Sequence, residues 1–110
     1  MAYSKKFRVE PIRSAAFGDI GAAYSAVGTA TTEPCRIISF INSTNEPAFV
    51  SLDGVTDHFY VAERSFKLFD ITANKVRDDG YFIPEGTVFY VRRADAGPTV
   101  GTFYIEVIIA

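Results

Sequence analysis

Short runs of strand-forming residues recur along this chain of 110 residues, and no run has the period and the length of a helix. The alternation is clearest over residues 102–109. One side of this predicted strand carries Phe103, Ile105, Val107 and Ile109, and the other carries Tyr104, Glu106 and Ile108. Because strands never alternate with helical segments, a parallel α/β sheet is excluded. The pattern predicts an antiparallel all-β protein.

The other predicted strands are separated by residues that are typical of turns. They fall at residues 7–12, 36–41, 48–52, 58–61, 65–71, 81–83 and 87–93. Seven to eight short strands at such spacing are typical of a sandwich or a barrel. The predicted fold class is therefore all-β: a single antiparallel β-sandwich, jelly-roll-like, with about seven to eight short strands and an extended N-terminal arm.

One hairpin is predicted at the pair Asp53-Gly54. The pair separates the run 48–52 from the run 58–61. An Asp-Gly pair between two strands is a strong hairpin signal, because glycine adopts the positive φ that such turns require. The sequence therefore predicts a tight turn here, with residues 58–61 as the return strand.

The run 65–71 also alternates, which gives this predicted strand two different faces. Phe66 and Leu68 fall on one face, and Lys67 and Phe69 fall on the other.

Residues 14–34 differ from the rest of the chain, because Ala, Gly, Ser and Thr dominate them. Three glycines in this segment would each cost a helix about 1 kcal/mol, so an extended arm is favoured over a short helix. The candidate contacts of this arm with neighbouring subunits are its apolar anchors, Phe17, Ile20, Tyr24 and Val27. The predicted organisation is one domain, with an N-terminal strand and Gly/Ala-rich arm at residues 1–34 and a sandwich body at residues 35–110.

Composition limits the partners that this chain can have. The net charge is −2 and no basic cluster exceeds a pair of residues, so a surface that follows the phosphates of nucleic acid is not expected. No apolar run approaches the roughly 20 residues that a membrane-spanning helix needs, and no signal peptide is evident. A chain of this size also builds only a marginal core, so partners can add to its stability.

The best local group of chemically active side chains lies at residues 53–58. Asp53 and Asp57 stand there beside His58, the only histidine. A metal site would use these three side chains, but no second histidine and no HxH or CxxC spacing accompanies them. The simpler interpretation makes Asp53-Gly54 a turn and Asp57 a hydrogen-bond acceptor that caps the loop.

No other catalytic pattern emerges from the sequence. A Ser-His-Asp triad would have His58 as its only possible base, and no GxSxG segment exposes a serine. Cys35 is the only cysteine, so it cannot form an intramolecular disulfide, and at the start of an apolar strand a thiol packs as a small hydrophobe. The sequence predicts a chain that is not an enzyme and has no cofactor and no metal.

Three segments carry a resemblance to a known group of proteins. They are SLDGVTDH at residues 51–58, FDITANK at 69–75 and IPEGTVFYV at 83–91, within a pattern that extends from residue 7 to residue 108. In these features the chain resembles small β-sandwich proteins of tailed-bacteriophage virions. The resemblance implies a scaffold, so no functional residue is carried over from it.

The resemblance implies a structural protein of the virion, with a capsid decoration or cement protein as the first expectation. The implied partners are the major capsid protein or other virion proteins, with homo-oligomers in the particle and neither nucleic acid nor membrane. A head-to-tail connector or tail protein of the same fold is the alternative. A more distant alternative is a carbohydrate-binding module or small hydrolase, in which Tyr60, Tyr81 and Tyr90 would stack on sugars.

Overall fold

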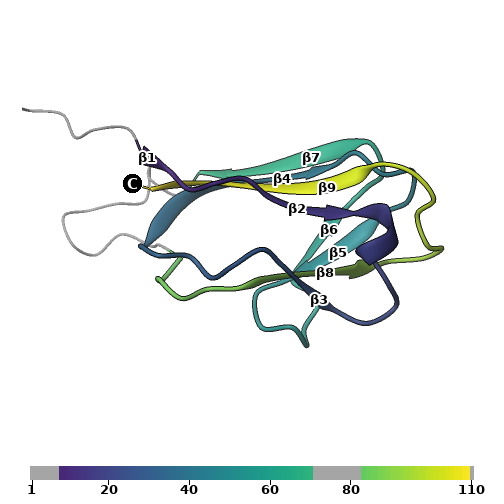
Figure 1. Ribbon diagram of the computed structural model, residues 1–110, viewed down its shortest axis with the longest axis horizontal. Helices are drawn as coiled ribbons and strands as arrows, with labels where there is room; N and C mark the ends of the chain where they lie inside the picture. Colours follow the sequence, from purple (N-terminus) through teal and green to yellow (C-terminus); the bar gives the residue numbers. More distant parts are fainter. Residues whose placement is uncertain (1–7, 71–82, 110) are drawn as a thin grey trace, which may run out of the picture.

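The computed structural model describes residues 8–70 and 83–109, and in these ranges the protein is a β-sandwich-like arrangement of two antiparallel sheets (Figure 1). Sheet A contains β1 (Arg8–Val9), β2 (Arg13–Ala16), β4 (Cys35–Asn42), β7 (Ser65–Asp70) and β9 (Thr102–Ile109). Sheet B contains β3 (Ser25–Val27), β5 (Ala48–Ser51), β6 (Phe59–Val61) and β8 (Phe89–Arg93). One short 3-10 helix, η1 (Phe17–Asp19), follows β2.

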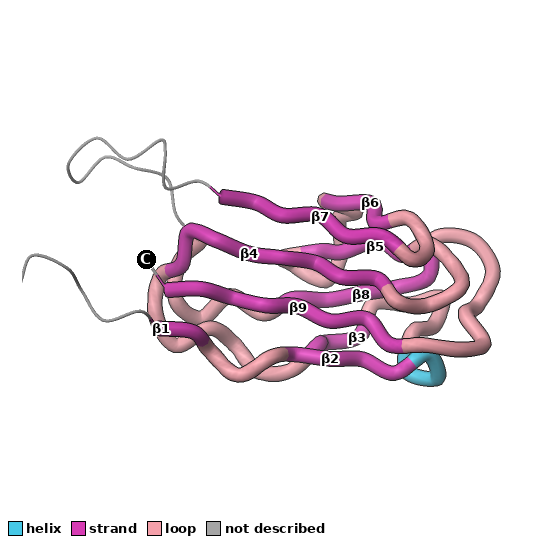
Figure 2. The backbone as a smooth tube through the Cα atoms, turned by 90° about the horizontal axis from the view of Figure 1, so that it is seen from above, coloured by secondary structure: helices cyan, strands magenta, loops and turns pink. Residues whose placement is uncertain are grey.

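The strand order places segments that are distant in the sequence side by side (Figure 2). Sheet A has the order β1-β9-β4-β7, and β2 pairs with β9 on the same side as β1. Sheet B has the order β3-β8-β5-β6. In both sheets every pair of neighbouring strands is antiparallel. β9 and β4 are thus the central strands of sheet A.

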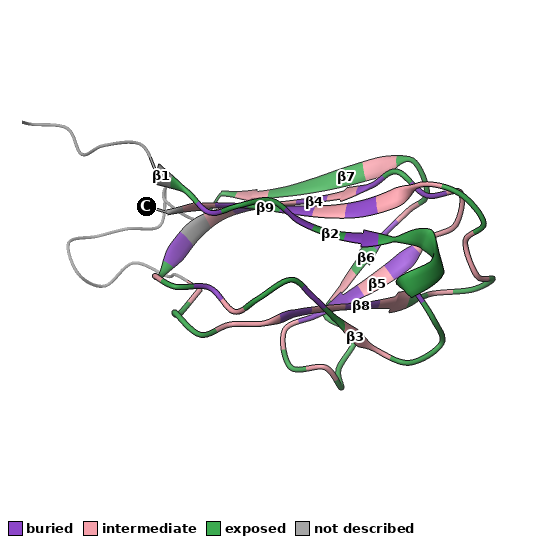
Figure 3. Cartoon of the chain, in the orientation of Figure 1, coloured by how far each residue is buried: buried purple, intermediate pink, exposed green. Residues whose placement is uncertain are grey.

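Aromatic rings join the two sheets at the centre of the core. The ring of Phe40 in sheet A lies 6.1 Å from that of Phe89 and 5.3 Å from that of Phe59, both in sheet B. Buried residues line the space between the sheets, whereas most of β7 is exposed (Figure 3). The core consists of Ala15, Ile20, Val27, Cys35, Ile38, Phe40, Ala48, Val50, Val61, Phe89, Val91, Phe103, Ile105 and Val107.

Most of the predicted strands are confirmed. The predictions at residues 36–41, 48–52, 65–71, 87–93 and 102–109 correspond to β4, β5, β7, β8 and β9. In β9 the alternation has the predicted sense, because Phe103, Ile105 and Val107 are buried and Glu106 is exposed. In the predicted strand 81–83, only Ile83 is described, and it forms an isolated bridge with Cys35. Residues 1–7, 71–82 and 110 lie outside the described ranges.

The prediction of an extended arm at residues 14–34 is wrong. β2 pairs with β9, with Ala15 opposite Phe103, and β3 pairs with β8, with Val27 opposite Phe89. Ile20 is only 5% exposed and Val27 only 1%, both within the core. Strand pairing satisfies the backbone polar groups and core burial stabilises these side chains, which together outweigh the entropy lost by the glycines. Residues 13–27 therefore belong to the sandwich itself.

The predicted tight turn at Asp53-Gly54 is also wrong, although the return strand is confirmed as β6. The last pair between β5 and β6 joins Val50 to Phe59, so a longer loop, residues 52–58, connects the two strands. Gly54 does have a positive φ of 79°.

Candidate interaction surfaces

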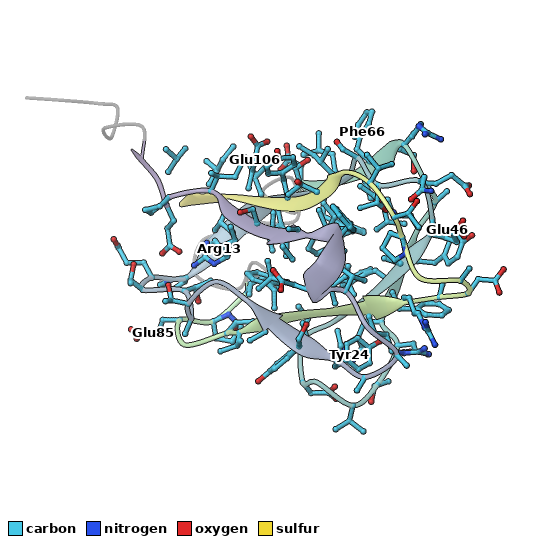
Figure 4. All side chains as sticks on the ribbon, turned by 45° about the vertical axis from the view of Figure 1, so that its right-hand side comes forward. Arg13, Tyr24, Glu46, Phe66, Glu85 and Glu106 are labelled. Carbon is cyan, nitrogen blue, oxygen red and sulfur yellow. The ribbon has the colours of Figure 1, made fainter. Side chains whose placement is uncertain are left out.

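The side of sheet A that faces away from sheet B is rich in apolar side chains. Phe66 and Leu68 on β7 are 67% and 60% exposed. Figure 4 shows Phe66 and Glu106 together on this side of the molecule. The strand registers define what we call the outer face of sheet A, which includes Val9, Ser14, Ile37, Ser39, Ile41, Phe66, Leu68, Asp70, Tyr104, Glu106 and Ile108.

Three cross-strand rows build this face. In the first row, Ile41 pairs with Phe66 on one side and with Tyr104 on the other. The second row is Leu68, Ser39 and Glu106, and the third contains Asp70, Ile37, Ile108 and Val9. Large apolar patches are uncommon on monomeric proteins and mark interaction sites, so this face is the first candidate for a functional surface.

Packing against sheet B decides which side of β7 points outward. The ring of Phe69 lies 4.7 Å from that of Phe59 and 5.7 Å from that of Phe40. Because successive strand residues point to opposite sides, Phe66 and Leu68 must then face solvent.

A shallow depression of about 360 Å³ lies at one end of this face. It is lined by Ile41, Asn42, Ser43, Arg64, Ser65 and Phe66. Arg64 has a positive φ of 49°, which is costly for a residue other than glycine. Its backbone N–H donates to the carbonyl of Thr44, 3.3 Å away. The chain thus carries a cationic side chain at this border, where glycine would be less strained.

The floor of this depression is held by a buried asparagine. The Nδ2 of Asn42 donates to the carbonyls of Glu46 and Val61, at 3.0 Å and 3.2 Å. Its Oδ1 accepts hydrogen bonds from the backbone N–H and the hydroxyl of Thr44. Since a buried amide with these partners is expensive to displace, this end of the face is pre-organised.

The outer side of sheet B carries a different, charged arrangement. Arg92 on β8 donates from Nε and Nη2 to the two carboxylate oxygens of Asp57, at 3.0 Å and 2.6 Å. The Tyr24 hydroxyl also donates to Asp57. The Arg92 guanidinium lies 4.7 Å from the ring centre of Phe49 and 5.5 Å from that of Tyr24. These groups satisfy one another within the chain.

The electrostatics of this cluster keep its charges in place at neutral pH. The hydrogen bonds from Arg92 and then from Tyr24 hold the pKa of Asp57 below its usual value. Burial, followed by the hydrogen bond to Asp57, raises the pKa of Tyr24 to about 12. The carboxylate therefore stays ionised and the phenol stays protonated, so this cluster does not exchange protons near pH 7.

The structure separates the three side chains that formed the sequence-based metal candidate. Asp53 Oδ1 accepts the backbone N–H groups of Val55 and Thr56, each at 2.8 Å, so Asp53 and not Asp57 caps the loop. These bonds place the pKa of Asp53 far below its usual range. His58 Nδ1 accepts the N–H of Leu52, while Asp57 pairs with Arg92. Within residues 8–70 and 83–109, no three His, Cys, Asp or Glu side chains are grouped as metal ligands.

Cys35 is fully buried in the core, as its place in an apolar strand predicted. Burial, followed by the nearby charge of Glu10, raises the pKa of its thiol to about 11. Since the thiolate is the nucleophile, this side chain is not activated for catalysis.

Of the four residues predicted to contact other subunits, two lie in the core and two lie outside it. Ile20 and Val27 lie in the chain's own core, which leaves neither side chain free to contact another subunit. Phe17, in η1, is exposed, and Tyr24 belongs to the Arg92 cluster. Contacts of these two residues with other subunits stay a prediction.

The tyrosines of the carbohydrate alternative are also dispersed. Tyr60 is exposed on β6, with its ring 5.7 Å from that of Phe49. Tyr90 is half-buried beneath Gly54, and Tyr81 lies outside the described residues.

No helix in the described part of the chain is long and apolar enough to cross a membrane. Comparison with known proteins yields no matching family model, no matching curated protein and no matching solved structure.

Proposed function

We propose that this chain is a structural protein of a tailed-phage virion, a capsid decoration or cement protein that stabilises the shell through contacts between subunits. The observation that carries the proposal is the outer face of sheet A, where exposed apolar side chains such as Phe66 and Leu68 gather. A repeated shell component gains stability when its neighbours cover such a face. The partners are then the major capsid protein or other copies of this chain.

The strand order supports a jelly roll as the finer description of the fold. With β1 and β2 taken as one broken strand, the eight strands form nested antiparallel pairs: β1/β2 with β9, β3 with β8, β4 with β7, and β5 with β6. Double-sheet jelly rolls occur in viral capsid proteins, and also in lectins and cupins. Because one fold serves many functions, this order is compatible with the proposal but does not carry it.

The two outer sides of the sandwich differ in chemistry, and this difference indicates which side would face the partners. The outer face of sheet A offers apolar surface, whereas on sheet B the ion pair of Arg92 and Asp57 is already satisfied. Sheet A is therefore the side that would be covered in the particle, and sheet B the side that would stay in solvent.

The copy number of the chain in purified particles of its phage tests this proposal. Quantitative mass spectrometry should find it at a number approaching that of the major capsid protein. A number in the tens would favour the connector or tail alternative, and absence from the particles would refute a virion role.

A matched pair of phage variants tests which surface is involved. Phe66→Ser with Leu68→Ser should reduce incorporation of the chain into particles, because both changes remove apolar contact area. Val55→Ser is the control and should leave incorporation unchanged, because Val55 is a strongly exposed residue of the loop 52–58, which we call the loop over sheet B. Equal incorporation of both variants would show that sheet A is not the contact surface.

The exposed ring of Tyr60 lies beside Phe49, whose ring also contacts the Arg92 guanidinium, and this is the one observation that favours the carbohydrate-binding alternative. Aromatic rings near polar groups are the usual platforms for sugars. A glycan array that shows binding in the wild type and loss of binding in Tyr60→Ala would support that function in place of the virion role.

A further inference from the structure

Apart from Asp70 at the far end of β7, two opposite charges lie on the outer face of sheet A, one on each side of its apolar centre. Arg64 comes two residues before Phe66, and its exposed side chain borders the same depression as Phe66 and Ile41. Glu106 comes two residues after Tyr104 on β9 and is also exposed. Among the residues that the structure describes, neither charge forms an ion pair. Both are therefore available to a charge from another molecule.

The strand directions place these two charges on opposite sides of Ile41. Ile41 pairs with Phe66 on β7 and with Tyr104 on β9, and both of these strands run antiparallel to β4. The step back from Phe66 to Arg64 is thus opposite in direction to the step forward from Tyr104 to Glu106. Glu106 is displaced from Ile41 by about 7 Å along the strands and about 5 Å across them. Arg64, in the turn just before β7, is displaced toward the opposite end of the sheet and on the opposite side of β4. Ile41 therefore lies between the two charges.

We propose that a second copy of this chain covers the outer face of sheet A, related to the first by a two-fold axis that lies in the interface, passes over Ile41 and is perpendicular to the line that joins Arg64 and Glu106. Such an axis exchanges the positions of Arg64 and Glu106, so that each copy's arginine meets the other's glutamate. The same patch then serves both copies, which is the property of an isologous interface.

The chemistry of the rest of the face fits this arrangement. The centre of the interface would hold Ile41, Phe66 and Leu68 of both copies, and the two ion pairs would flank it. An apolar centre with charged groups toward the rim is the usual anatomy of protein interfaces. The inference rests on the proposed function only in treating this face as a contact surface between subunits.

The edge of β7 is a poorer route to the same dimer. Lys67 lies in the middle of this edge strand, and it is exposed on the side of the sheet opposite Phe66 and Leu68. A charged side chain on an edge strand opposes the addition of another strand. Pairing of two β7 strands about their centre would also bring two lysines together, so the observations favour packing of the faces.

Sedimentation velocity and light scattering on the purified full chain test the proposal. The wild type should show a dimer whose fraction rises with concentration. Arg64→Glu sets two carboxylates against each other, and Glu106→Arg sets two guanidinium groups against each other. Each single variant should weaken the dimer at least about tenfold, because like charges at an interface are strongly unfavourable.

An equimolar mixture of the two single variants gives the sharpest readout. In a mixed pair the new carboxylate of one copy meets the new guanidinium of the other, and the unchanged Glu106 meets the unchanged Arg64. The mixture should therefore regain a dimer that neither variant forms alone. Arg93→Glu makes the same charge change on an exposed residue of sheet B and should leave the wild-type dimer intact. Thermal melts of all the variants confirm that they are folded.

Three results would overturn the inference: a wild type that stays monomeric at all concentrations, single variants that dimerise as the wild type does, or a mixture that does not regain the dimer. These results are independent of the copy number in particles. A chain that is abundant in virions but monomeric would refute only the dimer, and a dimeric chain that is absent from virions would refute only the virion role.

Discussion

Glu10 and Arg13 form an ion pair close to the core, with Arg13 Nη2 2.5 Å from Glu10 Oε1 and each side chain only 5% exposed. Figure 4 shows Arg13 directed toward the space between the two sheets. The second oxygen of Glu10 accepts the N–H and the hydroxyl of Thr32, at 2.9 Å and 2.7 Å. Burial alone would raise the pKa of Glu10, but the bonds from Arg13 and Thr32 outweigh it and lower the pKa.

Removal of this carboxylate should destabilise the protein. Glu10→Ala leaves the Arg13 charge buried without its partner, so we expect a loss of about 3 to 5 kcal/mol in the free energy of unfolding. Urea denaturation at pH 7 measures it. Glu85→Ala, on an exposed residue, is the control and should change little. A similar, small effect of both substitutions would contradict the structural role of the pair.

The same pair predicts a dependence of stability on pH. Because the pKa of Glu10 is lower in the folded state than in the unfolded chain, its contribution is present above about pH 4.5 and is lost as the pH falls through the folded pKa. The free energy of unfolding should therefore fall between pH 5 and pH 3 by more in the wild type than in Glu10→Ala. Equal slopes in the two proteins would show that Glu10 is not linked to folding.

The aromatic core predicts a second large effect. Phe103 is fully buried on the inner side of β9, and truncation of a buried phenylalanine costs about 3 to 5 kcal/mol. Phe103→Ala should lower the melting temperature strongly or unfold the chain. Tyr104→Ala, one residue along on the outer side, should lower it much less. A melting temperature of Phe103→Ala within two degrees of the wild type would be incompatible with this core.

Gly101 occupies a position where a side chain has no room. Its φ is +99°, and an added β-carbon would collide with the backbone carbonyl of Ser43 and the α-carbon of Thr44. Gly101→Ala should therefore cost about 2 to 4 kcal/mol, from the unfavourable φ and from the collision together. Gly18 has no atom within 4 Å of such a β-carbon, so Gly18→Ala should stay within about 0.5 kcal/mol of the wild type. Equal stabilities of the two variants would argue against the close approach.

Cys35 predicts a slow reaction with thiol reagents. Its side chain is fully buried and its pKa is raised to about 11, so a chromogenic disulfide at pH 8 should react with the native protein at least about a hundredfold more slowly than with the urea-unfolded chain. Rapid modification of the native protein would mean that the core opens readily at this position.

Periodicity in the sequence predicted the strands whose pattern is local. The alternation around Phe103 and Ile105 gave both the strand and its buried side, because each second residue in β9 meets the same core. Residues 14–34 lack such a pattern. The burial of Ile20 and Val27 comes from their packing with the rest of the core, across from strands that lie far along the chain. Composition of the segment alone could not show that tertiary contribution.

The candidate surfaces depend even more on long-range register. The alternation in β7 separated Phe66 and Leu68 from Phe69, but only the contact of Phe69 with Phe59 decides which side faces outward. The relation between Arg64 and Glu106 exists only because β7 and β9 both flank β4. No local pattern in the sequence marks it.

The loop over sheet B shows a different reason for failure. An Asp-Gly pair suits a two-residue turn, but the carboxylate of Asp53 and the hydroxyl of Ser51 instead organise a longer loop by accepting several backbone N–H groups. The turn propensity of the Asp-Gly pair correctly predicted that the chain reverses direction here. It did not predict the length of the loop, because side-chain hydrogen bonds compete with the tight turn.

The central position of β9 has a consequence for how the chain folds. This strand is the last of the described elements, yet it lies between β4 and the pair β1 and β2, so sheet A cannot be completed from segments that are close in sequence. Closing such long loops costs entropy before the new contacts return any stability, and proteins of this kind fold in milliseconds to seconds. The local pair β5 and β6 can form early, and the docking of β9 against β4 is then the expected rate-limiting step.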